Sequence, residues 1–119
     1  MALIMVVDDE FAALDLAVYT LEMAGHEVIG ALSARAALAA LDRRPDLVIT
    51  DLRMPLMSGI DLARCLRADR ATAGIPILMV TAFDPGQVDD SLIDRHMSKP
   101  FTPQGLRRCI GELLAPPAA

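Results

Sequence analysis

The 119 residues of this chain suffice for one domain, and 54% of them are hydrophobic, which supplies a core and excludes an intrinsically disordered chain. The formal net charge of −5 argues against direct nucleic-acid binding, because such binding depends on Lys and Arg neutralising phosphates. No apolar stretch reaches the roughly 18–20 residues needed to span a membrane, and residues 1–7 lack the basic flank and cleavage site of a signal peptide. We therefore expect a cytoplasmic protein.

Apolar runs bounded by turn residues predict buried strands, and apolar residues spaced three or four apart predict helices. In chain order, the predicted elements are a strand at 3–7, a helix at 11–24, an edge strand at 26–31, a helix from Ser33 to about 43–45, a strand at 47–51, a capping-box helix from Ser58 to about Arg67, a strand at 75–81, a short helix at best within 87–94, a strand at 95–98 and a helix from 103 to about 114.

Strands that alternate with helices predict a three-layer α/β domain, in which helices cover both faces of a five-stranded parallel sheet. Hydrophobic periodicity does not show strand order, and we expect the flavodoxin-like order 2-1-3-4-5. We expect a single domain over 1–119, with a core of about 3–114 and a frayed tail at 115–119. The two cysteines, Cys65 and Cys109, are far apart and lack a CxxC or His partner, so we expect reduced structural thiols.

Polar side chains stand where four of the predicted strands end. Asp8 and Asp9 follow the first strand, Asp51 ends the central one, Thr81 ends the fourth and Lys99 follows the fifth. Because the carboxyl ends of parallel strands share one edge of a sheet, we expect these side chains to converge. Clustered carboxylates repel one another unless positive charge balances them, and Mg²⁺ and the Lys99 ammonium would supply that charge. One carboxylate is then free to attack phosphorus and form an aspartyl phosphate.

Four motifs, each at a strand end and in this order, resemble the receiver domain of bacterial two-component response regulators over about residues 3–114. They are Val7-Asp8-Asp9-Glu10, the segment from Asp51 through Met54-Pro55 to Ser58-Gly59, Val80-Thr81-Ala82, and Lys99-Pro100-Phe101.

The resemblance implies that Asp51 accepts a phosphoryl group from a histidine kinase or histidine phosphotransfer protein. It implies that Mg²⁺ is bound directly by Asp9 and Asp51, with Asp8 acting through water and the backbone carbonyl of Arg53 as a further ligand. The domain would act as a regulatory phosphoacceptor and not as an enzyme, limited to self-phosphorylation and slow autodephosphorylation.

For the remaining strand ends, the resemblance implies that Thr81 and Lys99 contact the phosphoryl oxygens, and that the Lys99–Pro100 peptide bond is cis. Phosphorylation would change a face made by 83–98 and the last helix, which controls a downstream protein partner or an output domain missing from this sequence. We also hypothesise that Phe83, at the pocket rim, prolongs the phosphorylated state by blocking water.

Two features depart from the family pattern. Only 18 positions separate Thr81 from Lys99, which predicts a shortened or irregular fourth helix. His96 occupies the position where the family usually has an aromatic residue. In the family, that aromatic side chain changes rotamer and turns inward when the Thr hydroxyl moves toward the phosphoryl group. Because few apolar residues anchor 83–95, we expect that segment to be the least stable part of the fold and to become ordered on phosphorylation.

Two other functions remain as alternatives. A pseudo-receiver would use the fold for binding without phosphorylation, but the intact Asp51, Thr81 and Lys99 argue against it. A haloacid-dehalogenase-like phosphatase also uses Asp, Thr and Lys, but it needs a second acid two residues after its nucleophile, where Arg53 stands. An FMN flavodoxin is disfavoured as well, because the acidic residues after the first strand would repel its phosphate.

Overall fold

The structure, a computed structural model, describes residues 2–82 and 91–114 of the chain. Its elements are β1 (Leu3–Val7), α1 (Phe11–Met23), β2 (Glu27–Ala31), α2 (Ala34–Ala39), the 3₁₀ turn η1 (Leu41–Arg43), β3 (Leu47–Asp51), α3 (Gly59–Ala68), β4 (Ile77–Thr81), β5 (Arg95–Ser98) and α4 (Pro103–Leu114).

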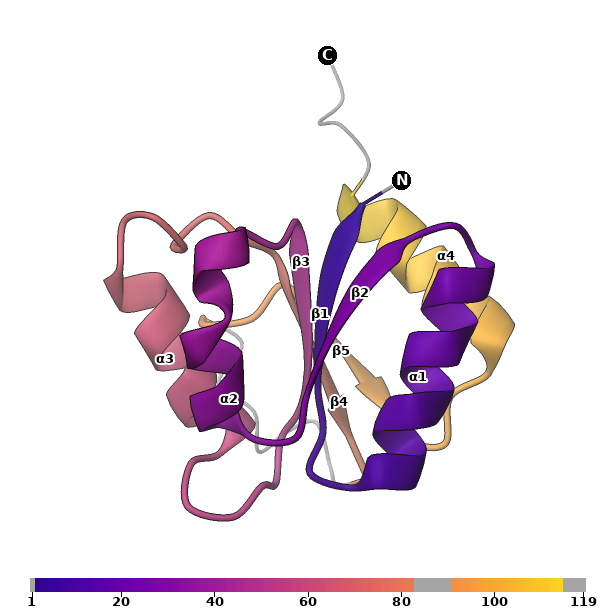
Figure 1. Cartoon of the computed structure of the whole chain (residues 1–119), viewed down its shortest axis with the longest axis horizontal. Helices are drawn as coiled ribbons and strands as arrows, with labels where there is room; N and C mark the ends of the chain where they lie inside the picture. Colours follow the sequence, from indigo (N-terminus) through magenta and orange to yellow (C-terminus); the bar gives the residue numbers. More distant parts are fainter. Residues whose placement is uncertain (1, 83–90, 115–119) are drawn as a thin grey trace.

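The five strands form one parallel sheet in the order β2-β1-β3-β4-β5. In Figure 1, α1 and α4 cover one face of the sheet and α2 and α3 cover the other. The predicted three-layer architecture, the flavodoxin-like strand order and the edge position of the second strand are therefore confirmed.

Side chains alternate between the two cores along the central strands. On β1, Met5 and Val7 pack into the core under α2 and α3, whereas Ile4 and Val6 pack into the core under α1 and α4. All four are buried. Both faces of such a strand must be apolar, which is why β1 and the first three residues of β3 are continuous apolar runs in the sequence.

Two helices begin at side-chain caps that the sequence predicted. The Ser33 hydroxyl accepts a hydrogen bond of 3.0 Å from the Ala36 N–H at the start of α2. At the start of α3, the Ser58 hydroxyl accepts from the Asp61 N–H, and the Asp61 carboxylate accepts from the Ser58 N–H, each at 3.1 Å. This reciprocal pair satisfies two N–H groups that the first turn leaves without intrahelical partners.

The predicted irregular fourth helix, the hypothesis on Phe83 and the predicted frayed tail concern residues 83–90 and 115–119, which lie outside the described residues. Within the described part, 91–94 is a turn rather than a helix. The expectation that few apolar residues anchor 83–95 is wrong for this part, because Ile93 is buried and Leu92 packs against the same core. The sequence did not reveal the burial of Ile93, because its neighbours along the chain are mostly polar and the core that covers it comes from other elements.

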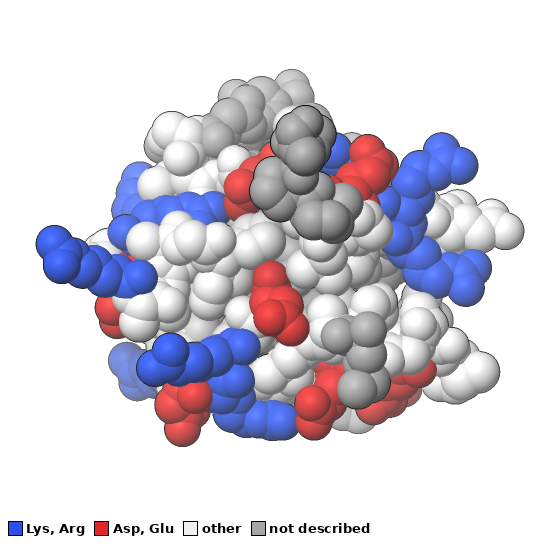
Figure 2. Space-filling view, turned by 90° about the horizontal axis from the view of Figure 1, so that it is seen from above, with Lys and Arg blue, Asp and Glu red and all other residues white. Residues whose placement is uncertain are grey.

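The edge at which the strands begin contains a cavity of about 600 Å³ lined by Ala2, His26, Asp46 and the end of α4. Figure 2 looks onto this end of the molecule and shows acidic and basic side chains interspersed around its rim.

Among residues 2–82 and 91–114, no helix is long and apolar enough to cross a bilayer. Cys65 is exposed and Cys109 is buried, and both are free thiols as predicted.

Candidate functional site

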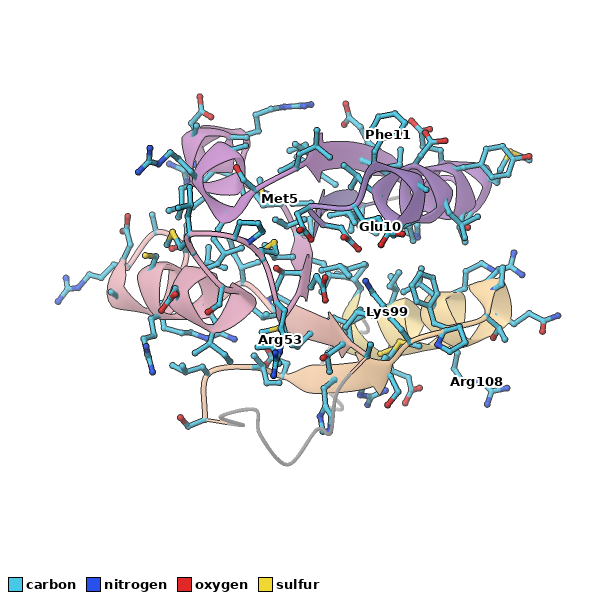
Figure 3. All side chains as sticks on the ribbon, turned by 90° about the horizontal axis from the view of Figure 1, so that it is seen from below. Met5, Glu10, Phe11, Arg53, Lys99 and Arg108 are labelled. Carbon is cyan, nitrogen blue, oxygen red and sulfur yellow. The ribbon has the colours of Figure 1, made fainter. Side chains whose placement is uncertain are left out.

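The polar side chains predicted to converge do meet at the carboxyl edge of the sheet, which Figure 3 views directly. Asp8, Asp9 and Asp51 each offer a carboxylate oxygen, and these oxygens all lie within 4.8 Å of one another. The Lys99 ammonium lies 3.0 Å from Asp8 Oδ2 and 3.5 Å from Asp51 Oδ2. The carboxyl ends of three strands, β1, β3 and β5, thus bring three negative charges and one positive charge into a single cluster.

Hydrogen bonds with main-chain groups hold Asp8 in place after β1. The Asp8 N–H donates to the Ala31 carbonyl at the end of β2 (3.1 Å), and Asp8 Oδ1 accepts from the Glu10 N–H (2.9 Å). Asp8 is buried as a result, whereas its neighbour Asp9 is exposed. The pair therefore presents one fixed carboxylate and one that is accessible from solvent.

The Asp51 carboxylate is held at the end of β3, with 15% of its side chain exposed. Its Oδ1 accepts a hydrogen bond of 2.9 Å from the Leu52 N–H. Burial raises the pKa of Asp51 above its ordinary value, and the neighbouring Asp8 adds to the rise, although Lys99 and the Leu52 N–H oppose it. The protein groups around Asp51 therefore do not fully balance the negative charge of its ionised carboxylate.

Lys99 follows β5, and its N–H donates to the Thr81 carbonyl at 2.9 Å. Burial alone would lower the pKa of Lys99, but the hydrogen bond to Asp8 and the charges of Asp51 and Asp8 outweigh it and raise the pKa. The ammonium is thus charged and directed at two of the three carboxylates. The predicted cis peptide bond between Lys99 and Pro100 is present.

The donor set fits a hard divalent cation. Among the residues that the structure describes, three carboxylates contact one ammonium, so negative charge exceeds positive charge in the cluster. Oxygen ligands are those that Mg²⁺ prefers. Arg53 lies at the same edge in the loop after β3 (Figure 3), where Leu52, Met54, Pro55 and Ser58 join it around a cavity of about 520 Å³. The role of its backbone carbonyl as a further ligand stays a prediction.

The two predicted switch residues lie on neighbouring strands. Thr81 is fully buried at the end of β4 and pairs in register with Ser98. His96 is half-buried and pairs with Met79. Because side chains alternate along a strand, His96 is on the same face of the sheet as Thr81, two register positions further from the site. The register places both residues where coupling between them is possible, and the switch itself stays a prediction.

Gly59 has a role at the site that the sequence analysis did not assign. Its N–H donates to the Leu52 carbonyl at 2.8 Å, and a Cβ built on Gly59 would overlap the main-chain carbonyl oxygen of Asp51. The capping-box motif locates Gly59 at the start of α3, but the approach of this helix to β3 is a tertiary contact.

The model of the family described as response regulator receiver domain matches residues 4–110 of the chain. The chain belongs to this family. The predicted resemblance is confirmed, and the chain is a receiver domain, the phosphoacceptor signalling module of two-component systems. The dehalogenase-like phosphatase is excluded as its family.

Two relatives illustrate how far the similarity extends. The receiver domain is 40% identical over 110 residues to the phosphate regulon transcriptional regulatory protein PhoB of Pseudomonas aeruginosa, covering 87% of this chain and 47% of that protein. It is 35% identical over 117 residues to the alkaline phosphatase synthesis transcriptional regulatory protein PhoP of Bacillus subtilis, covering 93% of this chain and 48% of that protein. The chain spans about half the length of these relatives.

Solved structures support the same assignment. The chemotaxis protein CheY4 of Vibrio cholerae superposes with a TM-score of 0.90 at 32% identity, covering 96% of this chain and 99% of that one. The response regulator TrrA of Thermotoga maritima, solved in complex with Mg²⁺ and BeF, superposes with a TM-score of 0.87 at 29% identity, covering 96% of this chain and 100% of that one.

Proposed function

We propose that Asp51 is the phosphoacceptor of this receiver domain and that the reaction requires Mg²⁺. The observation that carries the proposal is the cluster at the sheet edge, where Asp8, Asp9 and Asp51 lie within 4.8 Å of one another and Lys99 reaches two of them. An Asp51 carboxylate oxygen forms a bond to phosphorus while the phosphorus–nitrogen bond of a phosphohistidine donor breaks, and the electron pair leaves with the imidazole.

The residues around Asp51 take separate roles in this proposal. Asp9 and Asp51 bind Mg²⁺ directly, with the Arg53 carbonyl as a further ligand and Asp8 acting through water. When bound, the cation supplies positive charge that the phosphoryl oxygens and the three carboxylates share. The Lys99 ammonium neutralises a phosphoryl oxygen, because its 3.5 Å contact with Asp51 already places it beside the reacting carboxylate. The Thr81 hydroxyl donates to another oxygen.

The phosphodonor is a protein, either a histidine kinase or a histidine phosphotransfer protein. Support comes from large apolar side chains that α1 presents to solvent, namely Phe11, Leu16, Tyr19 and Met23. Phe11 lies at the site end of that helix, beside Glu10 (Figure 3), and Leu56 in the loop after β3 is fully exposed. Exposed apolar surface of this kind suits a protein partner that must bring its phosphohistidine to Asp51.

We infer that the phosphorylated domain acts through Thr81 and His96 on the face made by 83–98 and the last helix, and that this face controls a downstream partner or an attached output domain. The relatives PhoB and PhoP are named as transcriptional regulatory proteins, and this chain matches only about half of each. Any contact with nucleic acid would then fall to the output partner, because the net charge of this chain is −5.

The test is incubation with Mg²⁺ and acetyl phosphate, followed by intact mass measurement. The parent is expected to gain one phosphoryl group, and Asp51→Asn is expected to gain none, since it keeps the shape but lacks the nucleophilic oxygen. Asp15→Asn, an exposed carboxylate on α1, is the matched control and should behave as the parent. A parent that gains no mass from this donor would instead support the pseudo-receiver alternative.

A further inference from the structure

Arg67, near the end of α3, binds two segments that are distant in sequence. Its Nη1 donates to the carbonyls of Ala73 (2.8 Å) and Ile75 (2.7 Å), which precede β4. Its Nε donates to the Leu92 carbonyl (3.0 Å), and its Nη2 donates to Asp94 Oδ2 (2.7 Å). Only 22% of the Arg67 side chain is exposed. A planar guanidinium with five donors suits this set of acceptors, and a lysine could not satisfy them together.

Asp94 is the residue at which the pairing of β4 with β5 begins. Its N–H donates to the Ile77 carbonyl at 3.0 Å, and its Oδ2 accepts from the Ile77 N–H at 2.7 Å. That carboxylate oxygen is the one that Arg67 contacts. Arg67 therefore holds the side chain that joins the residue before β5 to the first residue of β4.

β5 depends on its ends for its register. Within residues 2–82 and 91–114 it is the edge strand of the sheet and pairs with β4 alone, and none of its four residues is fully buried. Burial specifies register weakly in such a strand. At the far end of β5, the Lys99 N–H bonds to the Thr81 carbonyl, and the Lys99 ammonium contacts Asp8 and Asp51. A slip by one residue would shift Lys99 by about 3.3 Å and reverse the direction of its side chain.

We propose that Arg67 is a positioning residue for Lys99: by holding Asp94, it fixes the register of β5 and thereby the place of the ammonium beside Asp51. The inference rests on the proposed function, because its consequence is a slower phosphoryl transfer to Asp51. Neither Arg67 nor Asp94 contacts the carboxylate cluster, so both act through the strand.

The kinetic test compares Arg67→Met with Arg64→Met. Arg64 is on the same helix, but its side chain is 64% exposed and forms a long 3.5 Å ion pair with Asp61. With acetyl phosphate and Mg²⁺, we expect Arg67→Met to reduce the rate of phosphoryl gain by about ten- to a hundredfold, since small misplacements of a catalytic group have effects of that size. Arg64→Met should match the parent.

Repeating the change in a Lys99→Met background isolates the route through Lys99. There, Arg67→Met should have little further effect on the rate, because the group it positions is gone. If Arg67→Met slows the reaction by the same factor with and without Lys99, the effect does not pass through Lys99 and the proposal is overturned.

Hydrogen exchange tests the same inference without phosphorylation, so it separates this proposal from the proposed function. Loss of Arg67 should speed exchange at the Asp94 and Lys99 amides more than at β3. Should Arg67→Met fail to fold, Asp94→Asn takes its place, because it removes the charged pair yet keeps an oxygen for the Ile77 N–H. Unchanged exchange at the Lys99 amide in a folded variant would overturn the role assigned to Arg67.

Discussion

Gly59, the first residue of α3, lies directly against the main-chain carbonyl of Asp51. A side chain at this position would overlap that oxygen and would lie 2.9 Å from the sulfur of Met79. The Gly59 N–H also bonds to the Leu52 carbonyl at 2.8 Å. The helix therefore begins in contact with the strand end that carries the proposed phosphoacceptor, and only glycine permits this approach.

Gly59→Ala should destabilise the fold, because the added methyl group meets main chain that cannot move without shifting Asp51. Overpacking of this kind costs about 1–3 kcal/mol. The matched control is Gly111→Ala in α4, where a Cβ would meet nothing within 4 Å. This substitution should stabilise the helix by up to about 1 kcal/mol. Urea unfolding of both variants measures the difference, and equal stabilities would contradict the close contact at Gly59.

Ser58→Ala should cost about 1 kcal/mol of unfolding free energy, since it removes the cap of α3.

The Ser58 N–H and hydroxyl lower the pKa of Asp61 below its ordinary value. A lowered pKa means that the folded state binds fewer protons, so this contribution is present above the ordinary pKa of Asp and is lost as the pH falls through the folded value. Asp61→Asn should accordingly be less stable than the parent at neutral pH, by a margin that shrinks in acid.

Asp51→Asn should raise the melting temperature at neutral pH when Mg²⁺ is chelated. Burial raises the pKa of Asp51, so the folded state binds more protons than the unfolded state between the ordinary and the raised pKa. Stability is lost as the pH rises through that window, and the neutral amide avoids the loss. Thermal scans from pH 3 to 7 should show the advantage of Asp51→Asn growing with pH, and an advantage that does not change with pH would be inconsistent with this origin.

Mg²⁺ should stabilise the parent fold by binding the folded state preferentially, by about 1.4 kcal/mol at ten times its dissociation constant. Asp9→Ala should abolish most of this response, because Asp9 is the exposed member of the acidic cluster. Asp42→Ala removes an exposed carboxylate in η1 and should respond as the parent does. A melting temperature that stays constant over a wide Mg²⁺ range would argue against a metal site among these carboxylates.

Hydrogen exchange should report a switch confined to part of the 83–98 segment. With a beryllium fluoride mimic of the phosphoryl group, we expect protection to increase over 83–91. At Asp94, protection should already be high in the resting state, because its N–H bonds to Ile77 and its carboxylate to Arg67. A segment 83–91 that is as protected at rest as β3 would remove the order–disorder interpretation.

Much of the fold and the carboxylate cluster could be predicted because the signals are local. Apolar runs that end on Asp8, Asp51 and Thr81 predict buried strands with polar carboxyl ends, and parallel strands necessarily bring those ends to one edge. The Ser58–Asp61 capping box likewise lies within four consecutive residues. The anchoring of Ile93 could not be predicted in this way, because its burial depends on a core supplied by other elements.

The sequence by itself determined the order of strands and helices, the family, and which side chains gather at the sheet edge. These features depend on hydrophobic periodicity and on the residues at strand ends, which are both properties of residues close together in the chain. Tertiary structure alone decided that Gly59 must admit the Asp51 carbonyl and that Arg67 reaches Asp94, 27 positions away. It also decided the pKa shifts of Asp51 and Lys99, because desolvation and charge pairing arise only when separate strands meet.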